Sequence, residues 1–182
     1  MKKFFLFAAF AVLFLAQAQA QRFGTRKATI SFQSETPMEK IEATNHTVSA
    51  VIDSKTGKFQ FAVLIKGFQF RKALMQEHFN ENYMESSKYP KASFKGQIIS
   101  DKEPDFFHSG TYDVQAKGQM TIHGVTKEIT VPAQIKISKA GATISAQFDV
   151  AVADYGIKIP SLVKNKIAKV VTVNVSGTLP KL

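Results

Sequence analysis

The sequence predicts an all-β fold, an antiparallel eight-stranded β-barrel with one short helical excursion. Two observations support this fold class: apolar residues recur at every second position through most of the chain, and short turn-forming connections separate the alternating segments. The alternation is lost over a long stretch only at residues 71–85. Eight antiparallel strands can close around an interior that holds packed side chains or one slender ligand. A β-sandwich fits the same alternation and stays open on pattern alone.

The first twenty residues predict a secretory signal peptide. Lys2 and Lys3 form a basic start, residues 4–15 are apolar, and Ala18-Gln19-Ala20 is a typical cleavage site. The apolar run of about twelve residues is shorter than the roughly twenty that a membrane-spanning helix needs. We therefore expect cleavage near Ala20, a periplasmic or secreted location, and one domain over residues 21–182.

The composition excludes several classes of function. The formal net charge is +10, and it falls to +8 when Lys2 and Lys3 leave with the signal. The lysines are scattered singly and the only arginines are Arg22, Arg26 and Arg71, so the chain lacks the basic cluster that a nucleic acid requires. Such diffuse charge favours solubility and weak attraction to anionic envelope surfaces. The chain has no cysteine, and therefore neither disulfides nor thiolate metal ligands.

The N-terminal part of the predicted barrel consists of three strands. Alternation predicts strands over residues 26–33 and 41–53, and the second runs into a turn of sequence DSKTGK at residues 53–58. Strict alternation over residues 59–65 predicts the third strand. The apolar phase then slips by one at Gly67, which we interpret as a glycine β-bulge that bends the strand, not as a new element.

A helical segment is expected next. Residues 71–85 lose the two-residue period and carry apolar side chains at roughly helical spacing, which predicts a short helix across one mouth of the barrel. An ordered loop is the alternative. Pro90 ends this segment, residues 92–98 begin a fourth strand, and residues 102–110 form a loop that contains Phe106 and Phe107.

A glycine-centred hairpin is the strongest local signal in the chain. Two alternating runs, over residues 112–122 and 129–137, flank the connection 123–126. Gly124 can supply a positive φ there without steric cost, as a tight hairpin turn requires.

The C-terminal part completes the meander. It predicts a turn at residues 139–142, a long strand over 144–152, a single helical turn or loop at 160–166 with Ser161 as its cap, and a last strand over 171–175.

No catalytic or metal site is recognisable. The four histidines lie in separate segments without a neighbouring ligand at metal-site spacing: His46, His78, His108 and His123. No serine lies in a nucleophile elbow, and Asp149 and Asp154 are five residues apart, so they would project from opposite faces of a strand. We therefore expect no enzyme, no metal and no cofactor.

Aromatic side chains are unusually frequent on the predicted strands. Five of the sixteen phenylalanines lie in the predicted signal, which leaves eleven. The apolar phases of the strands give ten candidate wall residues: Phe32, Phe59, Phe61, Val63, Phe68, Phe70, Phe94, Met120, Ile122 and Phe148. They could form a plain core. Because small residues such as Ala92, Ala116 and Ala146 share their phases, they could equally line an apolar tunnel, and pattern alone does not decide.

Three segments resemble the YceI-like family. Residues 117–131, KGQMTIHGVTKEITV, are similar to its hairpin, whose usual form is G-x-[LM]-T-[IL]-x-G-[VT]-[TK]. Residues 78–96 resemble its run that ends in Tyr-Pro and continues as a Phe strand, and residues 148–160 resemble its penultimate strand and Asp-aromatic-Gly-Ile turn. Where the family often has Phe-Phe before the Tyr-Pro, this chain has Tyr83 and Met84, a departure that bears on the subfamily.

The resemblance implies a lipocalin-like barrel that binds polyisoprenoids, including isoprenoid quinones. It favours the tunnel over the plain core, and it makes Phe79, Tyr83, Phe106 and Phe107 candidates for a rim or lid. On this basis we expect a carrier or sequestering protein for a long-chain lipid, in transient contact with an envelope membrane or its proteins. The oligomeric state, monomer or dimer, stays open. The alternatives are a filled barrel that presents Phe106 and Phe107 to a partner, and a lipid-modifying enzyme.

Overall fold

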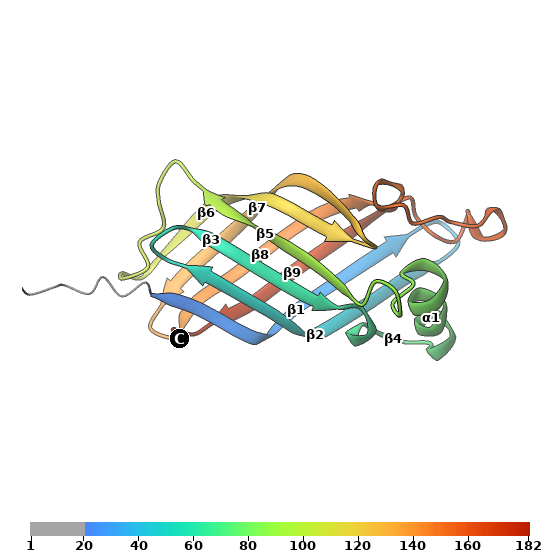
Figure 1. The fold of residues 1–182 in the computed structure, drawn as a ribbon, viewed down its shortest axis with the longest axis horizontal. Coiled ribbons are helices and arrows are strands. Elements are labelled where there is room, and N and C mark those ends of the chain that lie inside the picture. Colours follow the sequence, from blue (N-terminus) through green and yellow to red (C-terminus); the bar gives the residue numbers. More distant parts are fainter. Residues whose placement is uncertain (1–20) are drawn as a thin grey trace, which may run out of the picture.

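The computed structural model describes residues 21–182, so the predicted signal peptide lies outside the described residues. Eight antiparallel strands wrap into a closed barrel (Figure 1). They are β1 (Arg22–Glu35), β2 (Lys40–Asp53), β3 (Lys58–Leu64), β5 (Lys91–Ile99), β6 (Gly110–Ile122), β7 (Val125–Ser138), β8 (Gly141–Ala151) and β9 (Val170–Leu179). Neighbours follow the order β1-β9-β8-β7-β6-β5-β3-β2, and β1 pairs with β2 to close the ring. The predicted barrel is confirmed, and the β-sandwich is excluded.

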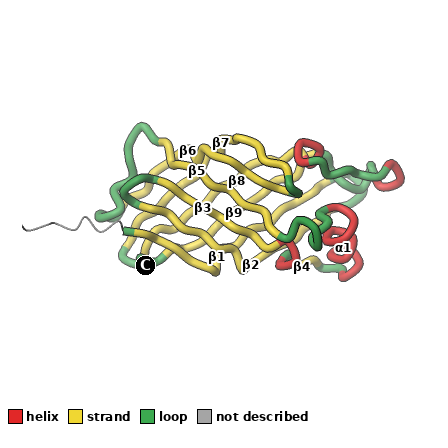
Figure 2. Tube along the Cα trace, viewed as in Figure 1, coloured by secondary structure: helices red, strands yellow, loops and turns green. Residues whose placement is uncertain are grey.

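The helical turns gather at one end of the barrel, as Figure 2 shows. They are α1 (Ala73–His78), a π-helical turn (Phe79–Tyr83) and three 3-10 turns (Ile65–Gly67, Val152–Tyr155 and Ser161–Val163). The helix predicted within residues 71–85 is confirmed. The predicted cap at Ser161 is wrong, because the residue in the cap position is Pro160 and no side chain caps this turn.

The two ends of the barrel differ because consecutive connections of an antiparallel meander alternate between them. We call the end that carries connections 36–39, 65–90, 123–124 and 152–169 the mouth end, and the opposite end the packed end. At the packed end the ring of Phe106 lies 5.3 Å from that of Phe23, and both side chains are buried. A compact apolar core therefore fills that end.

The predicted hairpin is formed by β6 and β7. Their register is unbroken over thirteen residue pairs, from Gly110 opposite Ile137 to Ile122 opposite Val125. The turn has two residues, His123 with φ 50° and Gly124 with φ 76°. Two successive left-handed residues are typical of the hairpin turn whose twist matches that of its strands.

The predicted β-bulge at Gly67 is wrong. The strand ends at Leu64, the chain makes the 3-10 turn, and β4 (Gln69–Phe70) then pairs with β2 beyond the end of β3. The fully buried Asn45 fills this corner: its Nδ2 donates to the carbonyl oxygen of Leu64 at 2.9 Å. A Cβ on residue 67 would lie 2.6 Å from that nitrogen, so Gly67 is needed for close approach to Asn45 and not for a bulge.

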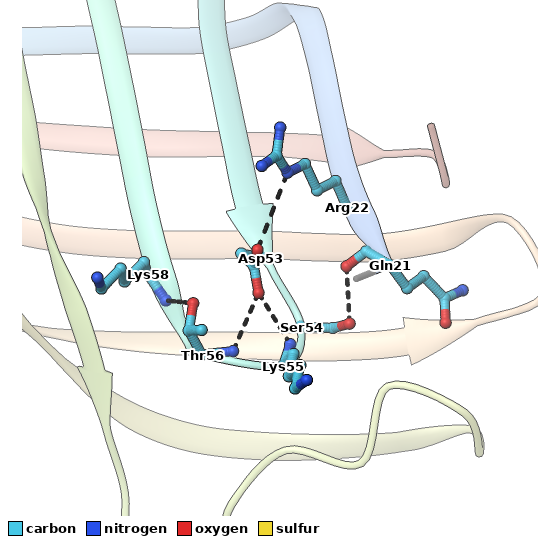
Figure 3. A network of polar contacts seen from close by, with 7 residues as sticks. All are labelled: Gln21, Arg22, Asp53, Ser54, Lys55, Thr56 and Lys58. Atoms are coloured by element: carbon cyan, nitrogen blue, oxygen red, sulfur yellow. Dashed lines mark hydrogen bonds and ion pairs between the residues drawn. The ribbon is translucent and has the colours of Figure 1, made fainter. Parts of the chain in front are cut away.

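The β2–β3 turn at the packed end is held by Asp53 (Figure 3). One carboxylate oxygen accepts hydrogen bonds from the backbone N–H groups of Lys55, at 3.1 Å, and Thr56, at 3.0 Å, and the other lies 3.9 Å from Nε of Arg22. The Thr56 bond, foremost among these contacts, holds the pKa of Asp53 below its usual range, so the carboxylate stays charged at neutral pH. The turn predicted from DSKTGK is confirmed.

Strands β5 and β6 approach closely where Gly96 lies opposite Gly118. Replacing Gly96 by alanine should lower the free energy of unfolding by about 3 kcal/mol, because the new Cβ would lie 2.0 Å from the carbonyl oxygen of Lys117, a backbone atom that cannot rotate away. Urea denaturation would measure this loss. Lys95→Ala, at an exposed neighbour on the same strand, is the control and should change stability by less than about 0.5 kcal/mol. Equal stability of the two variants would contradict the close approach.

Candidate functional site

An apolar cavity of about 570 Å³ occupies the barrel interior. Inward-facing side chains of the strands line it, since successive residues of a strand point to opposite faces. All ten side chains predicted to form a wall line this cavity: Phe32, Phe59, Phe61, Val63, Phe68, Phe70, Phe94, Met120, Ile122 and Phe148. Their contact with a ligand stays a prediction.

Small inward-facing residues leave the space that the cavity occupies. Ala92, Ala116 and Ala146 line the cavity as expected, on three different strands. Ala28 and Ala50 share the inward phase but are buried in the packed core and do not line it. The alternation of large and small residues thus fills part of the barrel and leaves part of it open.

Phe79 fixes the helical segment to the barrel wall. Its ring lies 5.4 Å from Phe32, 5.5 Å from Phe68 and 5.0 Å from Phe70, measured between ring centroids. Aromatic pairs at this separation stabilise contacts beyond their buried area. The helical segment therefore forms one side of the cavity entrance.

The four predicted rim residues do not form one rim, which corrects that prediction. Phe79 and Tyr83 line the cavity at the mouth end. Phe106 and Phe107 lie in the connection between β5 and β6, at the packed end, where Phe106 is buried and Phe107 is 79% exposed. The connection that follows β3 and the connection that follows β5 must lie at opposite ends of an antiparallel barrel.

The segment between β8 and β9 was missed as a wall of the cavity. Half-buried Ile157, Ile159, Val163 and Ile167 line the cavity from it. The backbone N–H of Ala168 donates to Oγ of the buried Ser34 at 2.8 Å, which attaches this segment to β1. The two isoleucines on either side of Lys158, Ile157 and Ile159, were the available signal.

Titratable side chains of Glu, Lys and His line the cavity only near its mouth, among the residues that the structure describes. They are Glu39, Lys72, His78 and Lys166. Nζ of Lys72 lies 3.6 Å from a carboxylate oxygen of Glu39. The cavity reaches solvent here, because Leu74, also among its lining residues, is 61% exposed. Partial burial raises the pKa of Tyr83, so its hydroxyl keeps its proton and can donate a hydrogen bond to a bound molecule.

A side-chain contact between Glu85 and His123 joins the helical segment to the β6–β7 turn. Nε2 of His123 lies 2.7 Å from a carboxylate oxygen of Glu85, and its Nδ1 lies 3.2 Å from the carbonyl oxygen of Tyr155. The ring of Tyr89 packs on the imidazole at 4.6 Å. Glu85 and His123 are the two described residues other than glycine with positive φ, so both hold costly backbone conformations at this contact.

The aspartates considered above as a catalytic pair contact other side chains of the barrel. Among residues 21–182, no three histidine, aspartate or glutamate side chains come together as a metal site. Asp149 accepts a hydrogen bond from Oγ1 of Thr172 at 2.8 Å, and Asp154 lies 3.2 Å from Nζ of Lys127. These two carboxylates hold neighbouring side chains and do not face each other.

Helices long and apolar enough to cross a membrane do not occur among residues 21–182.

An eight-stranded antiparallel barrel around an apolar cavity defines a lipocalin-like class of protein. The family model of the YceI-like domain matches residues 21–179. The chain therefore belongs to the YceI-like family, which confirms the resemblance of its three motifs. A comparison with curated proteins finds no match.

Solved structures share the fold at low sequence identity. A polyisoprenoid binding domain from Saccharophagus degradans is 16% identical with a TM-score of 0.69, and the match covers 90% of this chain and 99% of that one. BcnA of Burkholderia cenocepacia is 18% identical with a TM-score of 0.68, over 82% and 94% of the two chains. The YceI protein of Campylobacter jejuni is 13% identical with a TM-score of 0.57, over 100% and 99%.

The contact between Glu85 and His123 predicts that substitutions at the two positions have non-additive effects on the free energy of unfolding. Each single replacement, Glu85→Ala or His123→Ala, should lower the free energy of unfolding by about 1 kcal/mol, and the double variant should lose less than the sum. The reason is that each variant removes the same contact, while alanine keeps the costly left-handed backbone. Urea denaturation of the wild type, the two single variants and the double variant completes this double-mutant cycle. Glu81→Ala, an exposed carboxylate of the same segment, is the control, and strict additivity of the two replacements would show that the contact carries no energy.

Proposed function

We propose that the protein encloses the hydrocarbon chain of one polyisoprenoid, isoprenoid quinone or similar long-chain lipid. The apolar cavity carries this proposal: about 570 Å³ is within the range of ligand pockets, and aromatic and aliphatic side chains dominate its wall. The polyisoprenoid binding domain of Saccharophagus degradans, with the same fold, supports the class of ligand.

Burial of hydrocarbon provides the driving force. At roughly 25 cal/mol per Å², or about 0.8 kcal/mol per methylene, a few prenyl units could reach about −8 kcal/mol after ordering costs, which is micromolar affinity. Such contacts have no direction, so the wall selects for chain width and length. Head-group selection falls to the polar residues near the mouth, Lys72, His78, Tyr83 and Lys166.

We propose a carrier or sequestering role outside the cytoplasm, after cleavage of the predicted signal peptide near Ala20. Catalysis is not part of the proposal, because the charged residues that line the cavity are confined to its mouth. The filled-barrel alternative is disfavoured by the cavity itself, and by Phe106, which is buried in the core and cannot meet a partner.

Native mass spectrometry of the protein purified from its own envelope, followed by organic extraction, tests the proposal directly. We expect one co-purifying isoprenoid or related lipid per chain. A protein that is empty as isolated and also refuses added prenyl lipids would contradict the proposal and favour an interaction module.

Two substitutions in the cavity should abolish loading for different reasons. Phe61→Asp places a carboxyl group, which must lose its hydration, against hydrocarbon, and Ala146→Phe fills the space from the opposite wall. Each should weaken prenyl-lipid binding at least about a hundredfold, the effect of roughly 2.7 kcal/mol.

Fluorescence titration with a prenyl lipid would measure both variants, and circular dichroism would verify that they fold. Gln60→Asp adds the same charge to the exposed face of the same strand and should bind like the wild type. If both variants fold and both bind the prenyl lipid like the wild type, the cavity is not the lipid-binding site.

A further inference from the structure

Three segments of the mouth expose large apolar side chains to solvent. Met38 of the β1–β2 connection is 62% exposed, Leu74 of α1 is 61% exposed, and Leu162 of the 3-10 turn at Ser161–Val163 is 92% exposed. The same three segments border the cavity, through Glu39, Leu74 and Val163 among others. The apolar tips therefore surround the cavity entrance.

The segment between β8 and β9 is amphipathic across its two faces. Its isoleucines and Val163 line the cavity, while Lys158, Lys164 and Lys169 are exposed and do not line it. Lys166 is also exposed and lines the cavity at its mouth. Residues 156–169 contain no acidic side chain, and within the described chain none of these lysines forms an ion pair. Four unpaired cations around the most exposed leucine of the structure leave this face without a partner of opposite charge.

The neighbouring mouth segments carry carboxylates, but these do not cancel the basic segment. Glu39 is paired with Lys72, Glu85 with His123, and Asp154 of the β8–β9 connection with Lys127. Glu35, Glu77 and Glu81 lie on the β1–β2 side and the helical side of the mouth. Positive charge is thus concentrated on the β8–β9 side, around Leu162.

The β5–β6 connection at the packed end offers the opposite combination. Phe107 is also strongly exposed, but its connection, residues 100–109, carries Asp101, Glu103 and Asp105 against the single Lys102. Exposed apolar side chains occur at both ends, but Leu162 lies in a basic segment beside the cavity, whereas Phe107 lies in an acidic connection away from it. These two connections therefore provide a matched comparison within one molecule.

We propose that the mouth docks on the surface of an anionic lipid bilayer through Leu162 and the lysines of residues 156–169, so that a lipid enters the cavity without crossing water. This inference rests on the proposed function, since it names the surface from which the cavity is loaded. Lysines near an anionic membrane each strengthen binding about fivefold, and an apolar tip inserts among the headgroups. The cavity mouth then faces hydrocarbon, which removes the cost of hydrating a long apolar chain.

Vesicle sedimentation tests the docking surface without reference to the cavity. The protein should bind vesicles of equimolar phosphatidylcholine and phosphatidylglycerol more tightly than vesicles of phosphatidylcholine alone, and added salt should weaken this difference. Leu162→Gln should weaken binding to the anionic vesicles about tenfold, the loss expected for one inserted leucine. The triple variant Lys158→Gln, Lys164→Gln, Lys169→Gln should abolish the preference for anionic vesicles.

Phe107→Gln is the matched control, because it removes another strongly exposed apolar side chain from the acidic β5–β6 connection at the packed end. It should bind vesicles like the wild type. Equal loss of binding in Phe107→Gln and Leu162→Gln, or equal wild-type binding to neutral and anionic vesicles, would overturn the docking surface.

Loading from detergent micelles separates this inference from the proposed function. Leu162 does not line the cavity, so Leu162→Gln should take up a prenyl lipid from micelles like the wild type and from anionic vesicles more slowly. Normal uptake from micelles without binding to any vesicle would overturn the docking surface and leave the proposed function standing. A wild-type protein that takes up no lipid from micelles would overturn the proposed function, while vesicle binding would still decide the docking surface.

Discussion

Closure of the barrel at β1 is the constraint on which the rest of the structure depends. β1 pairs with β2 along one edge and with β9 along the other, so that Ile30 lies opposite both Asn45 and Val175. Register shifts between Thr25 and Ile30 bend the strand enough to serve both neighbours. Because the sheet is closed, every second residue of eight strands faces one shared interior. The cavity follows from this closure and from small inward residues such as Ala146.

The same closure explains why the two ends of the molecule differ in chemistry. At the packed end, Phe106 folds inward against Phe23 and seals the core. At the mouth end, the long connections cannot fold inward without filling the cavity, so they border it, anchored by Phe79, by Ser34 and by the contact of His123 with Glu85. Their apolar faces line the cavity and their charged side chains reach water.

Strand periodicity was sufficient to predict which side chains share one face of the sheet, because a two-residue period assigns each side chain to one face. Phe61 and Phe148 were assigned to the inward face in this way, whereas the choice of a barrel with an open interior rested on the resemblance to the YceI-like family. Periodicity failed where the chain leaves the sheet: Gly67 was read as a bulge because the fit to Asn45 joins residues far apart in sequence. Phe106 was misplaced although alternating connections already assigned it to the other end. The β8–β9 segment has no single period, so its wall residues were not recognised.

The pairing of β1 with β9 also determines when the barrel can close during synthesis and folding. The first and last strands must meet, and the backbone N–H of Leu182 donates to the carbonyl oxygen of Arg22 at 2.8 Å. Contacts between the two ends of a sequence form slowly, because a long loop must close before they stabilise anything. Until β9 has been synthesised the sheet keeps two open edges and has no enclosed interior. A binding cavity therefore exists only in the finished chain, and a chain truncated before Val170 would expose aromatic strands to aggregation.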